Sequence, residues 1–287
     1  MNNKLIIILM VLNIKLFKFS KQKYDNSYNL MVFRLRSITL LMKQIKKFID
    51  IEGFLALLKH PFIYSREILY ILSSKFKIKK RGQNYSLNSL VDFTFHLNNG
   101  YILPFQKESE ILQLLKYLKV KKPKIILEIG TASGGTLFLF TRIASNDATI
   151  ISIDLPKGEY GGGYSKKREY LYRSFKLAHQ KLFLLRCDSH DNQTLLKVKG
   201  ILNKRKIDFL FIDGDHSYQG VKKDFEMYSP LVNKDGLIAF HDIVMHHKYK
   251  TVDVVKFWNE IKVKFNHEEI IDDVDQGMFG IGLLRKN

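Results

Sequence analysis

Residues 125–136 read IILEIGTASGGT, an apolar run that passes directly into a glycine-rich turn. The first five residues have the length and the β-branched composition of a buried strand. Gly130 and Gly134 allow a tight turn and a close approach of the backbone to a ligand. The apolar residues that follow predict a helix over residues 135–144. Together they predict a strand, a turn and a helix, the repeating unit of a parallel sheet.

Downstream, short apolar runs alternate with amphipathic segments as far as residue 240. Further strands are expected at residues 149–153, 182–186, 209–212, 236–240 and 277–285. Helices are expected at residues 108–118, 167–179, 193–202 and 218–228. This alternation predicts an α/β fold with a doubly wound, mostly parallel sheet that is covered by helices on both faces.

An acidic residue, Asp154, ends the second strand, twenty positions beyond Gly134. In doubly wound folds an acid at this place accepts hydrogen bonds from ribose hydroxyls. A glycine-rich turn alone is a weak signal, but its place after a strand and the acid on the next strand agree. The two features predict a ligand that contains adenosine.

The turn resembles the first motif of the class I S-adenosylmethionine-dependent methyltransferases, in which an acidic residue precedes glycines and a helix. Glu128, Gly130 and Gly134 carry the resemblance, and Ala132 replaces a glycine that is often found there. The replacement argues against a dinucleotide site, where the second glycine makes room for a pyrophosphate. The resemblance implies a Rossmann-like, seven-stranded methyltransferase fold with an antiparallel last strand, and S-adenosylmethionine as the cofactor.

The resemblance also implies the residues that contact the cofactor. Glu128 and Gly130 would border its methionine and ribose portions, Asp154 would bind the ribose hydroxyls, and Asp188 with Ser189 would lie near the adenine. The full expected set is Glu128, Gly130, Thr131, Gly134, Asp154, Asp188 and Ser189.

Over residues 100–287 the sequence is similar to small-molecule O-methyltransferases and cephalosporin-hydroxylase-like proteins. The similarity is carried by FQ at 105–106, IDLP at 153–156, GGGY at 161–164, CDSHD at 187–191, FIDGDHSY at 211–218 and FHDI at 240–243. It implies methylation of a hydroxyl on a small molecule or a glycan. A diverged, hydroxylase-like relative with different chemistry is the alternative.

Polar residues end the fourth strand at Asp213, Asp215 and His216, and the fifth at His241 and Asp242. Because the carboxyl ends of parallel strands meet at one edge, these side chains are expected to converge. In the metal-dependent methyltransferases that the chain resembles, the equivalent positions are an acid on the fourth strand and an acid pair or acid–amide pair on the fifth, and here His241 occupies the first position of that pair. Two hypotheses follow: Asp213, His241 and Asp242 bind Mg²⁺ or, more suitably for histidine, Mn²⁺; or His241 acts as a base without a metal.

The chemistry expected is in-line attack of a substrate hydroxyl on the sulfonium methyl group. Alignment of the reactants can contribute ~7–11 kcal/mol, and a general base typically adds a factor of ~10² to 10⁴. Asp213, His241 and His216 are the expected catalytic residues.

The charge is uneven: 47 Lys and Arg face 28 Asp and Glu, and 17 of these cations but only 4 acids lie in residues 1–82. Residues 1–30 are expected to be a basic tail, or to precede a true start at Met31. Residues 31–82 are expected to be a basic, amphipathic helical arm, and residues 83–287 the catalytic domain. Such an arm predicts peripheral contact with an anionic membrane or binding to a partner. The alternatives are a cap that packs on the catalytic domain and a surface for self-association into a homo-oligomer.

Several partners and compartments are disfavoured. The sequence has no recognisable nucleic-acid-binding motif, so a nucleic-acid methyltransferase or binding protein remains a rival supported by charge alone. No apolar run approaches the ~18 residues of a membrane span. The single cysteine, Cys187, excludes an intramolecular disulfide. The expected location is the cytoplasm or the inner face of its membrane.

Overall fold

The computed structural model describes residues 61–82, 85–157, 163–247, 249–273 and 275–287. The predicted tail and residues 31–60 of the predicted arm lie outside these residues. The chain divides into two compact units, Met1–Leu69 and Tyr70–Asn287, and the second contains the sheet. Within the described ranges, no helix has both the length and the apolar character required to cross a bilayer.

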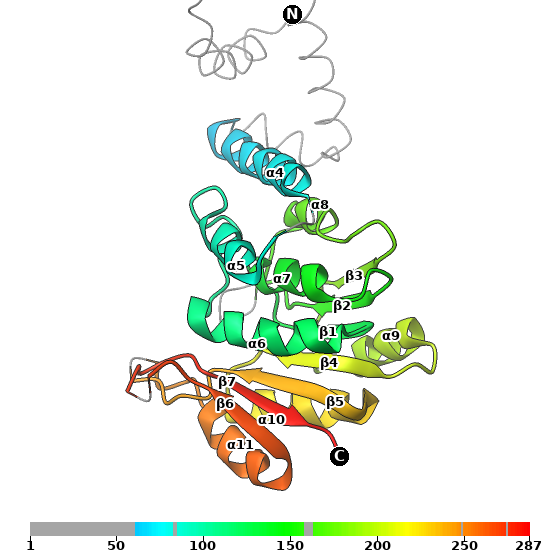
Figure 1. Ribbon diagram of the computed structural model, residues 1–287, viewed down its shortest axis with the longest axis vertical. Coiled ribbons are helices and arrows are strands. Elements are labelled where there is room, and N and C mark those ends of the chain that lie inside the picture. Colours follow the sequence, from blue (N-terminus) through cyan, green and yellow to red (C-terminus); the bar gives the residue numbers. More distant parts are fainter. Residues whose placement is uncertain (1–60, 83–84, 158–162, 248, 274) are drawn as a thin grey trace, which may run out of the picture. The chain divides into compact units, whose positions relative to one another are not determined.

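The described elements largely follow the predicted order (Figure 1). The helices are α4 (Pro61–Arg81), α5 (Leu87–His96), α6 (Glu108–Lys121), α7 (Gly135–Ile143), α8 (Arg168–Tyr172), α9 (Asn192–Leu202), α10 (Tyr218–Tyr228) and α11 (Val254–Ile261). The strands are β1 (Ile125–Ile129), β2 (Thr149–Ile153), β3 (Lys181–Leu185), β4 (Ile207–Ile212), β5 (Val232–His241), β6 (Asn266–Ile270) and β7 (Ile281–Arg285).

The seven strands form one sheet in the order β3-β2-β1-β4-β5-β7-β6. Strands β1 to β5 run parallel, whereas β7 is antiparallel to β5, with Ala239 opposite Leu283. The strand order reverses between β1 and β4, and because β1 to β5 are parallel, the carboxyl ends of β1, β2, β4 and β5 lie on the same edge of the sheet. The predicted fold class is therefore confirmed.

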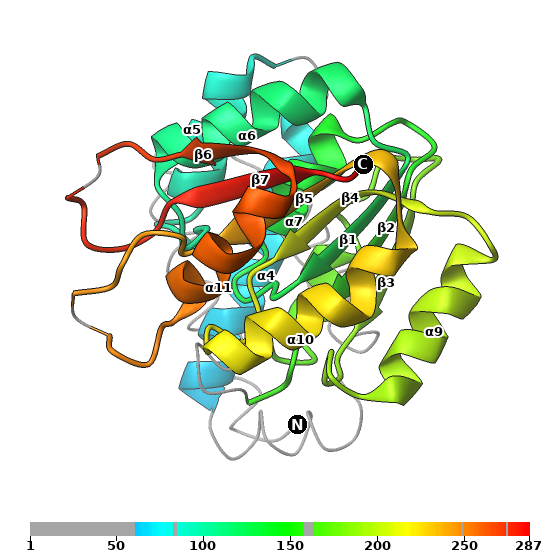
Figure 2. The ribbon, with the colours of Figure 1, turned by 90° about the horizontal axis from the view of Figure 1, so that it is seen from below.

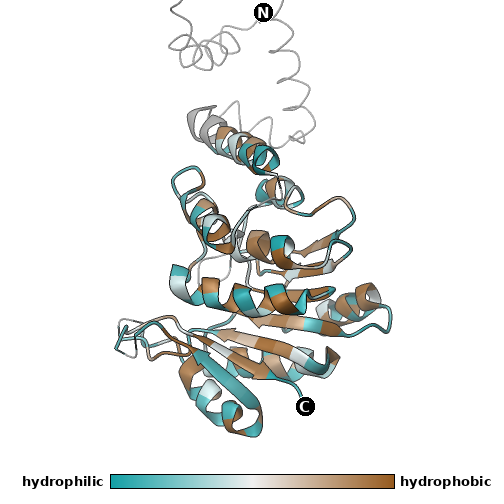
Figure 3. Cartoon of the chain, in the orientation of Figure 1, coloured by the Kyte–Doolittle hydropathy of each residue, from teal (hydrophilic) through white to brown (hydrophobic). Residues whose placement is uncertain are grey.

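Helices cover both faces of the sheet, because the central strands have apolar side chains on both of their sides. On one face, seen in Figure 2, α9, α10 and α11 pack on the sheet, and Phe225 and Trp258 join Leu127 in one apolar cluster. On the other face, the Phe140 ring of α7 meets the rings of Phe209 and Phe211 edge-on, at centroid distances of 5.2 and 5.3 Å. Figure 3 shows the resulting apolar strands between more polar helix surfaces. Strands buried on both faces are apolar throughout rather than alternating.

Several elements differ from the prediction: α5 and α11 had no predicted bounds, β5 begins four residues earlier than expected and β7 four residues later. Two further differences have a clear physical reason. Strand β6 was not predicted, because its sequence, NHEEI, is polar and four of its five residues are exposed at the sheet edge. Charged residues on an edge strand prevent it from pairing with another chain. The helix expected over 167–179 ends at Tyr172, because the chain then turns to bury Phe175 against Phe138, with ring centroids 5.2 Å apart.

The second compact unit begins at Tyr70, earlier than the boundary expected near residue 83. Tyr70 stacks on Tyr101, with ring centroids 5.2 Å apart. Asn98 Nδ2 donates to Ser74 Oγ at 2.7 Å. The C-terminal part of α4 therefore packs with the residues that follow it.

Candidate active site

The glycines of the turn after β1 are required by close backbone contacts. Gly130 has φ +87°, and a Cβ there would lie 1.8 Å from the carbonyl oxygen of Asp213. Gly134 has φ +88°, and a Cβ there would lie 2.6 Å from the ring of Tyr172. Both conformations favour glycine. The turn thus lies directly against the end of β4.

Asp154 is buried at the end of β2 and binds the turn. Its Oδ2 accepts hydrogen bonds from the backbone amides of Thr131 at 2.9 Å and Ala132 at 2.6 Å. Burial raises the pKa of Asp154, and these two amide hydrogen bonds oppose that effect. The structure therefore places Asp154 beside the glycine turn.

Glu128 is fully buried in β1, beneath the same turn. Its Oε2 accepts a hydrogen bond from Thr131 Oγ1 at 2.7 Å, whereas Oε1 has no hydrogen-bond partner among the described residues. Burial raises the pKa of Glu128 to about 8. A buried acceptor without a donor is uncommon in proteins, and it marks a place where a ligand could supply one.

The predicted adenine residues follow β3, the strand next to β2. Asp188 is exposed, and its Oδ1 accepts a hydrogen bond from the backbone amide of His190 at 2.8 Å. The carbonyl oxygen of Ser189 accepts one from the Tyr228 hydroxyl at 2.7 Å. Both residues therefore lie at the carboxyl edge of the sheet, in a loop that α10 holds in place.

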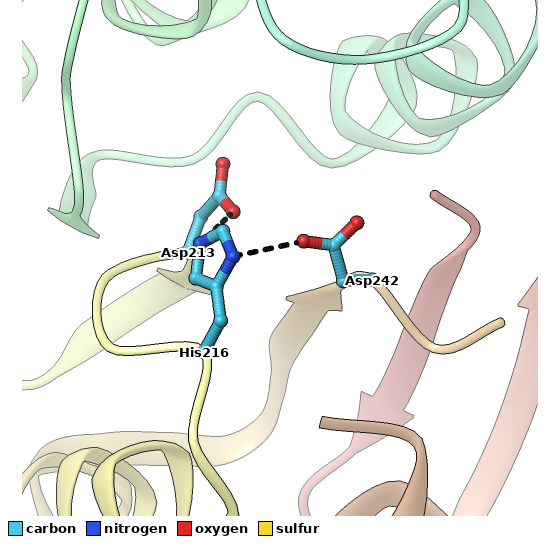
Figure 4. A group of neighbouring side chains, drawn as sticks. All are labelled: Asp213, His216 and Asp242. Atoms are coloured by element: carbon cyan, nitrogen blue, oxygen red, sulfur yellow. Dashed lines mark ion pairs between the residues drawn. The ribbon is translucent and has the colours of Figure 1, made fainter. Parts of the chain in front are cut away.

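Asp213, His216 and Asp242 form a compact group at the ends of β4 and β5 (Figure 4). His216 lies between the two carboxylates, with Nε2 3.4 Å from Asp213 Oδ1 and Nδ1 3.1 Å from Asp242 Oδ2. One potential ligand atom of each residue lies within 4.8 Å of the others. These three side chains could bind one metal ion.

His241 lies beside this group and is buried. Its Nδ1 is 3.0 Å from Asp213 Oδ1 and 3.5 Å from Asp242 Oδ1, and its ring packs against Phe279 with centroids 5.7 Å apart. Its Nε2 is buried and has no hydrogen-bond partner among the described residues. The sequence assigned His241 to both the metal and catalysis and His216 to catalysis alone, whereas in the structure His216 completes the metal-compatible group.

The charges of the cluster are mutually dependent. Burial alone would raise the pKa values of Asp213 and Asp242, but the imidazoles of His241 and His216 hold both below their ordinary value. Burial alone would lower the histidine pKa values, but hydrogen bonds to Asp213 and Asp242 raise that of His216 to about 10. The same two carboxylates raise the pKa of His241 well above its ordinary value. Two carboxylates and two imidazolium groups therefore balance one another.

Two further side chains reach the cluster without having been predicted to do so. Gln106 Nε2 donates to Asp213 Oδ2 at 2.9 Å, and His246 Nε2 lies 2.9 Å from Asp242 Oδ1. Gln106 belongs to the FQ pair that carries the family similarity, which was the only signal for it. Asp215 does not converge with the others as expected: its Oδ1 caps the next turn by accepting from the Ser217 amide at 2.9 Å.

Comparisons with known proteins agree with this geometry. Residues 127–243 match a family model described as a methyltransferase domain, which spans β1 to the end of β5. An uncharacterized protein of Acanthamoeba polyphaga mimivirus is 31% identical over 158 residues, which cover 55% of this chain and 64% of that protein. One of Sinorhizobium fredii is 28% identical over 145 residues, 49% of this chain and 15% of that protein. The chain thus spans less than two thirds of either relative.

A solved structure from Staphylococcus aureus, assigned as a caffeoyl-CoA O-methyltransferase, has a TM-score of 0.50 and 22% identity to this chain. The alignment covers 75% of this chain and 100% of that one. At this identity the likeness shows the fold alone. The family match over residues 127–243, the strand order and the glycine turn agree: this part of the chain is similar to a methyltransferase domain and has the fold expected of class I, S-adenosylmethionine-dependent methyltransferases.

Proposed function

We propose that this protein transfers a methyl group from S-adenosylmethionine to a hydroxyl of a small-molecule or glycan acceptor. The observation that carries the proposal is the position of the Asp213–His216–Asp242 group. It lies at the ends of β4 and β5, and Asp213 directly contacts the glycine turn at Gly130. A turn suited to the cofactor and a group suited to a hydroxyl thus share one edge of the sheet, where ligands of doubly wound sheets bind.

Two buried carboxylates fit the cofactor. The unpartnered Oε1 of Glu128 suits the ammonium of the methionine portion, which has hydrogen-bond donors. Asp154, whose carboxylate accepts hydrogen bonds from the turn amides, supports ribose recognition, because an acid at the end of the second strand accepts hydrogen bonds from ribose hydroxyls in doubly wound folds. Because S-adenosylmethionine has no pyrophosphate, its binding does not require a glycine at position 132.

The donor set at the end of β4 and β5 fits a divalent metal. Asp213 and Asp242 would provide carboxylate oxygens and His216 an imidazole nitrogen, a combination that suits Mn²⁺ better than Mg²⁺. A divalent ion bound here would lower the pKa of the acceptor hydroxyl. Gln106 and His241 contact Asp213 and would fix the direction of its carboxylate.

The reaction forms one bond and breaks one. The acceptor oxygen bonds to the methyl carbon while the carbon–sulfur bond breaks, sulfur keeps the electron pair, and the hydroxyl proton leaves to a base or to solvent. The chain's main task is to align the hydroxyl with the methyl group, because alignment can account for ~7–11 kcal/mol.

Calorimetric titration with S-adenosylmethionine, with and without Mn²⁺ or Mg²⁺, tests cofactor binding. We expect micromolar binding by the wild type, a loss of at least tenfold for Asp154→Ala, and no change for Asp147→Ala, an exposed acid before β2. The absence of binding to folded wild-type protein would overturn the proposal.

The transfer itself is tested with cofactor labelled on the methyl group and a panel of hydroxylated glycans and phenols. We expect label in the acceptor and in none of the products made by Asp213→Asn, which keeps the shape of the side chain. Undiminished transfer by that variant would remove Asp213 from the mechanism.

A further inference from the structure

The glycine turn contains strained backbone that neighbouring groups must hold. Ala132 has φ +42°, in the left-handed region that residues other than glycine rarely adopt. Such a conformation persists only where the surrounding structure determines it. On one side, the amides of Thr131 and Ala132 donate to Asp154. The carbonyl groups of the turn point to another partner.

That partner is the short helix α8. The Tyr172 hydroxyl donates to the Ala132 carbonyl at 2.8 Å, and Arg168 Nη1 donates to the Ser133 carbonyl at 3.2 Å. The Tyr172 ring also covers Gly134. Arg168 and Tyr172, one helical turn apart in α8, thus hold two successive carbonyl groups of the glycine turn.

Arg168 is itself held in place. Its Nη1 donates to the Tyr101 carbonyl at 3.1 Å and lies 3.4 Å from the Tyr172 hydroxyl, and its guanidinium lies 4.3 Å from the centre of the Tyr101 ring. A planar guanidinium can stack on a ring and donate to several acceptors at once, which an ammonium cannot. By contrast, Arg173, directly after this helix, has an ion pair with the side chain of Glu169 and no other among the described residues, and it is 58% exposed.

Tyr101 and helix α8 also connect the glycine turn to α4. The Tyr101 ring that stacks on Arg168 also stacks on Tyr70, and the ammonium of Lys75 lies 3.7 Å from the centre of the Tyr170 ring in α8. The C-terminal part of α4 therefore packs against α8 and Tyr101 and supports them.

We infer that Arg168 is a positioning residue for S-adenosylmethionine: together with Tyr172 it fixes the strained turn in the conformation that binds the cofactor. The inference rests on the proposed function, because it requires the cofactor to bind at this turn. Arg168 acts through the backbone of Ser133, so its loss weakens cofactor affinity by releasing the turn.

Calorimetric titration of the full chain with S-adenosylmethionine tests this, with thermal unfolding of each variant measured in parallel. We expect Arg168→Gln to raise the Kd at least tenfold, and Arg168→Lys to raise it by a smaller factor because one donor is restored. Tyr172→Phe keeps the ring over Gly134 and loses only the hydroxyl, so we expect a three- to tenfold increase. Arg173→Gln, directly after the same helix, is the matched control, with a Kd within twofold of the wild type.

A change in cofactor affinity must be distinguished from a general loss of protein stability. We expect the melting temperature of Tyr172→Phe to stay within a few degrees of the wild type while its Kd rises, and this variant decides the case if Arg168→Gln does not fold. Unchanged Kd values for both Tyr172→Phe and a folded Arg168→Gln would overturn the inference while leaving the proposed function intact. No binding by the wild type would overturn both.

Discussion

Glu128 is the residue whose burial has the clearest thermodynamic consequence. Its pKa is raised to about 8 by burial, from 4.5 when exposed. Between these values the unfolded chain releases the proton and the folded protein keeps it, so stability falls as the pH rises. The contribution is fully favourable below pH 4.5 and is lost by pH 8. We expect this loss to be on the order of 5 kcal/mol, since the pKa differs by about 3.5 units and one unit corresponds to ~1.4 kcal/mol.

Glu128→Gln removes the titration and keeps the size of the side chain. Urea unfolding at pH 5 and pH 8, without cofactor, should therefore show the variant gaining stability relative to the wild type as the pH rises. Glu108→Gln, an exposed acid in α6, serves as the control and should follow the wild type. Parallel profiles for Glu128→Gln and the wild type would show that Glu128 has an ordinary pKa.

The two histidines of the acidic cluster can be distinguished by metal binding. His216 lies between the two carboxylates, whereas His241 is covered by Phe279. We therefore expect His216→Gln to weaken Mn²⁺ binding at least tenfold in a calorimetric titration, and His241→Gln to weaken it less. Exposed His267→Gln is the control. The opposite ranking would favour the ligand set that the sequence alone suggested.

At this scale the sequence predicts residues that end strands and misses residues that reach the site from loops. Asp213 and Asp242 were predicted because the carboxyl ends of parallel strands meet at one edge. Gln106 precedes α6 and His246 follows β5 by several residues, so no strand register places them. Their contacts depend on how two loops fold back over the edge, which local sequence does not determine.

Among the elements, the sequence predicts those whose apolar pattern is decided by burial on both faces. The bounds of β1, β2 and α10 agree residue for residue with the prediction. Strand β6 has no such pattern, since only its pairing with β7 makes it a strand. Helix α8 ended early because Phe175 is needed in the core, a tertiary requirement that outweighs helix propensity.

Helix α6 fixes the connection between β6 and β7 through one buried acid. Glu110 accepts hydrogen bonds from the Gly280 amide at 3.0 Å, Gln276 Nε2 at 2.7 Å and the Asp272 amide at 3.3 Å. Removing a buried acceptor leaves its donors unsatisfied, at a cost of about 1–3 kcal/mol each at most. We expect Glu110→Ala to lower the free energy of unfolding by about 3 kcal/mol.

Denaturant unfolding of Glu110→Ala beside Glu108→Ala checks this, because Glu108 is exposed on the same helix. We expect the control to change stability by less than about 0.5 kcal/mol, as is usual for surface substitutions. Equal effects of the two substitutions would mean that the buried hydrogen bonds contribute nothing beyond helix propensity.

For the whole molecule, the uneven charge is the feature with the broadest consequence. Residues 1–82 hold 17 cations and 4 acids, whereas residues 83–287 hold 30 and 24. A cation near an anionic membrane contributes ~1 kcal/mol, and the attraction decays within a Debye length. We therefore expect the full chain to bind vesicles that contain phosphatidylserine, and to dissociate as NaCl is raised from 0.05 to about 0.5 M.

Two triple variants that remove the same number of positive charges distinguish an effect of the arm on vesicle binding from an effect of net charge. The first variant replaces Lys43, Lys46 and Lys47 of the predicted arm with Gln. The second replaces the exposed Lys197, Lys199 and Lys204 of the second compact unit with Gln. In vesicle co-sedimentation we expect the first to lose at least tenfold in binding and the second less than threefold, because only charges near the surface contribute. Equal losses would mean that net charge alone drives the attraction, and equal binding of the wild type to neutral vesicles would exclude an electrostatic role for the arm.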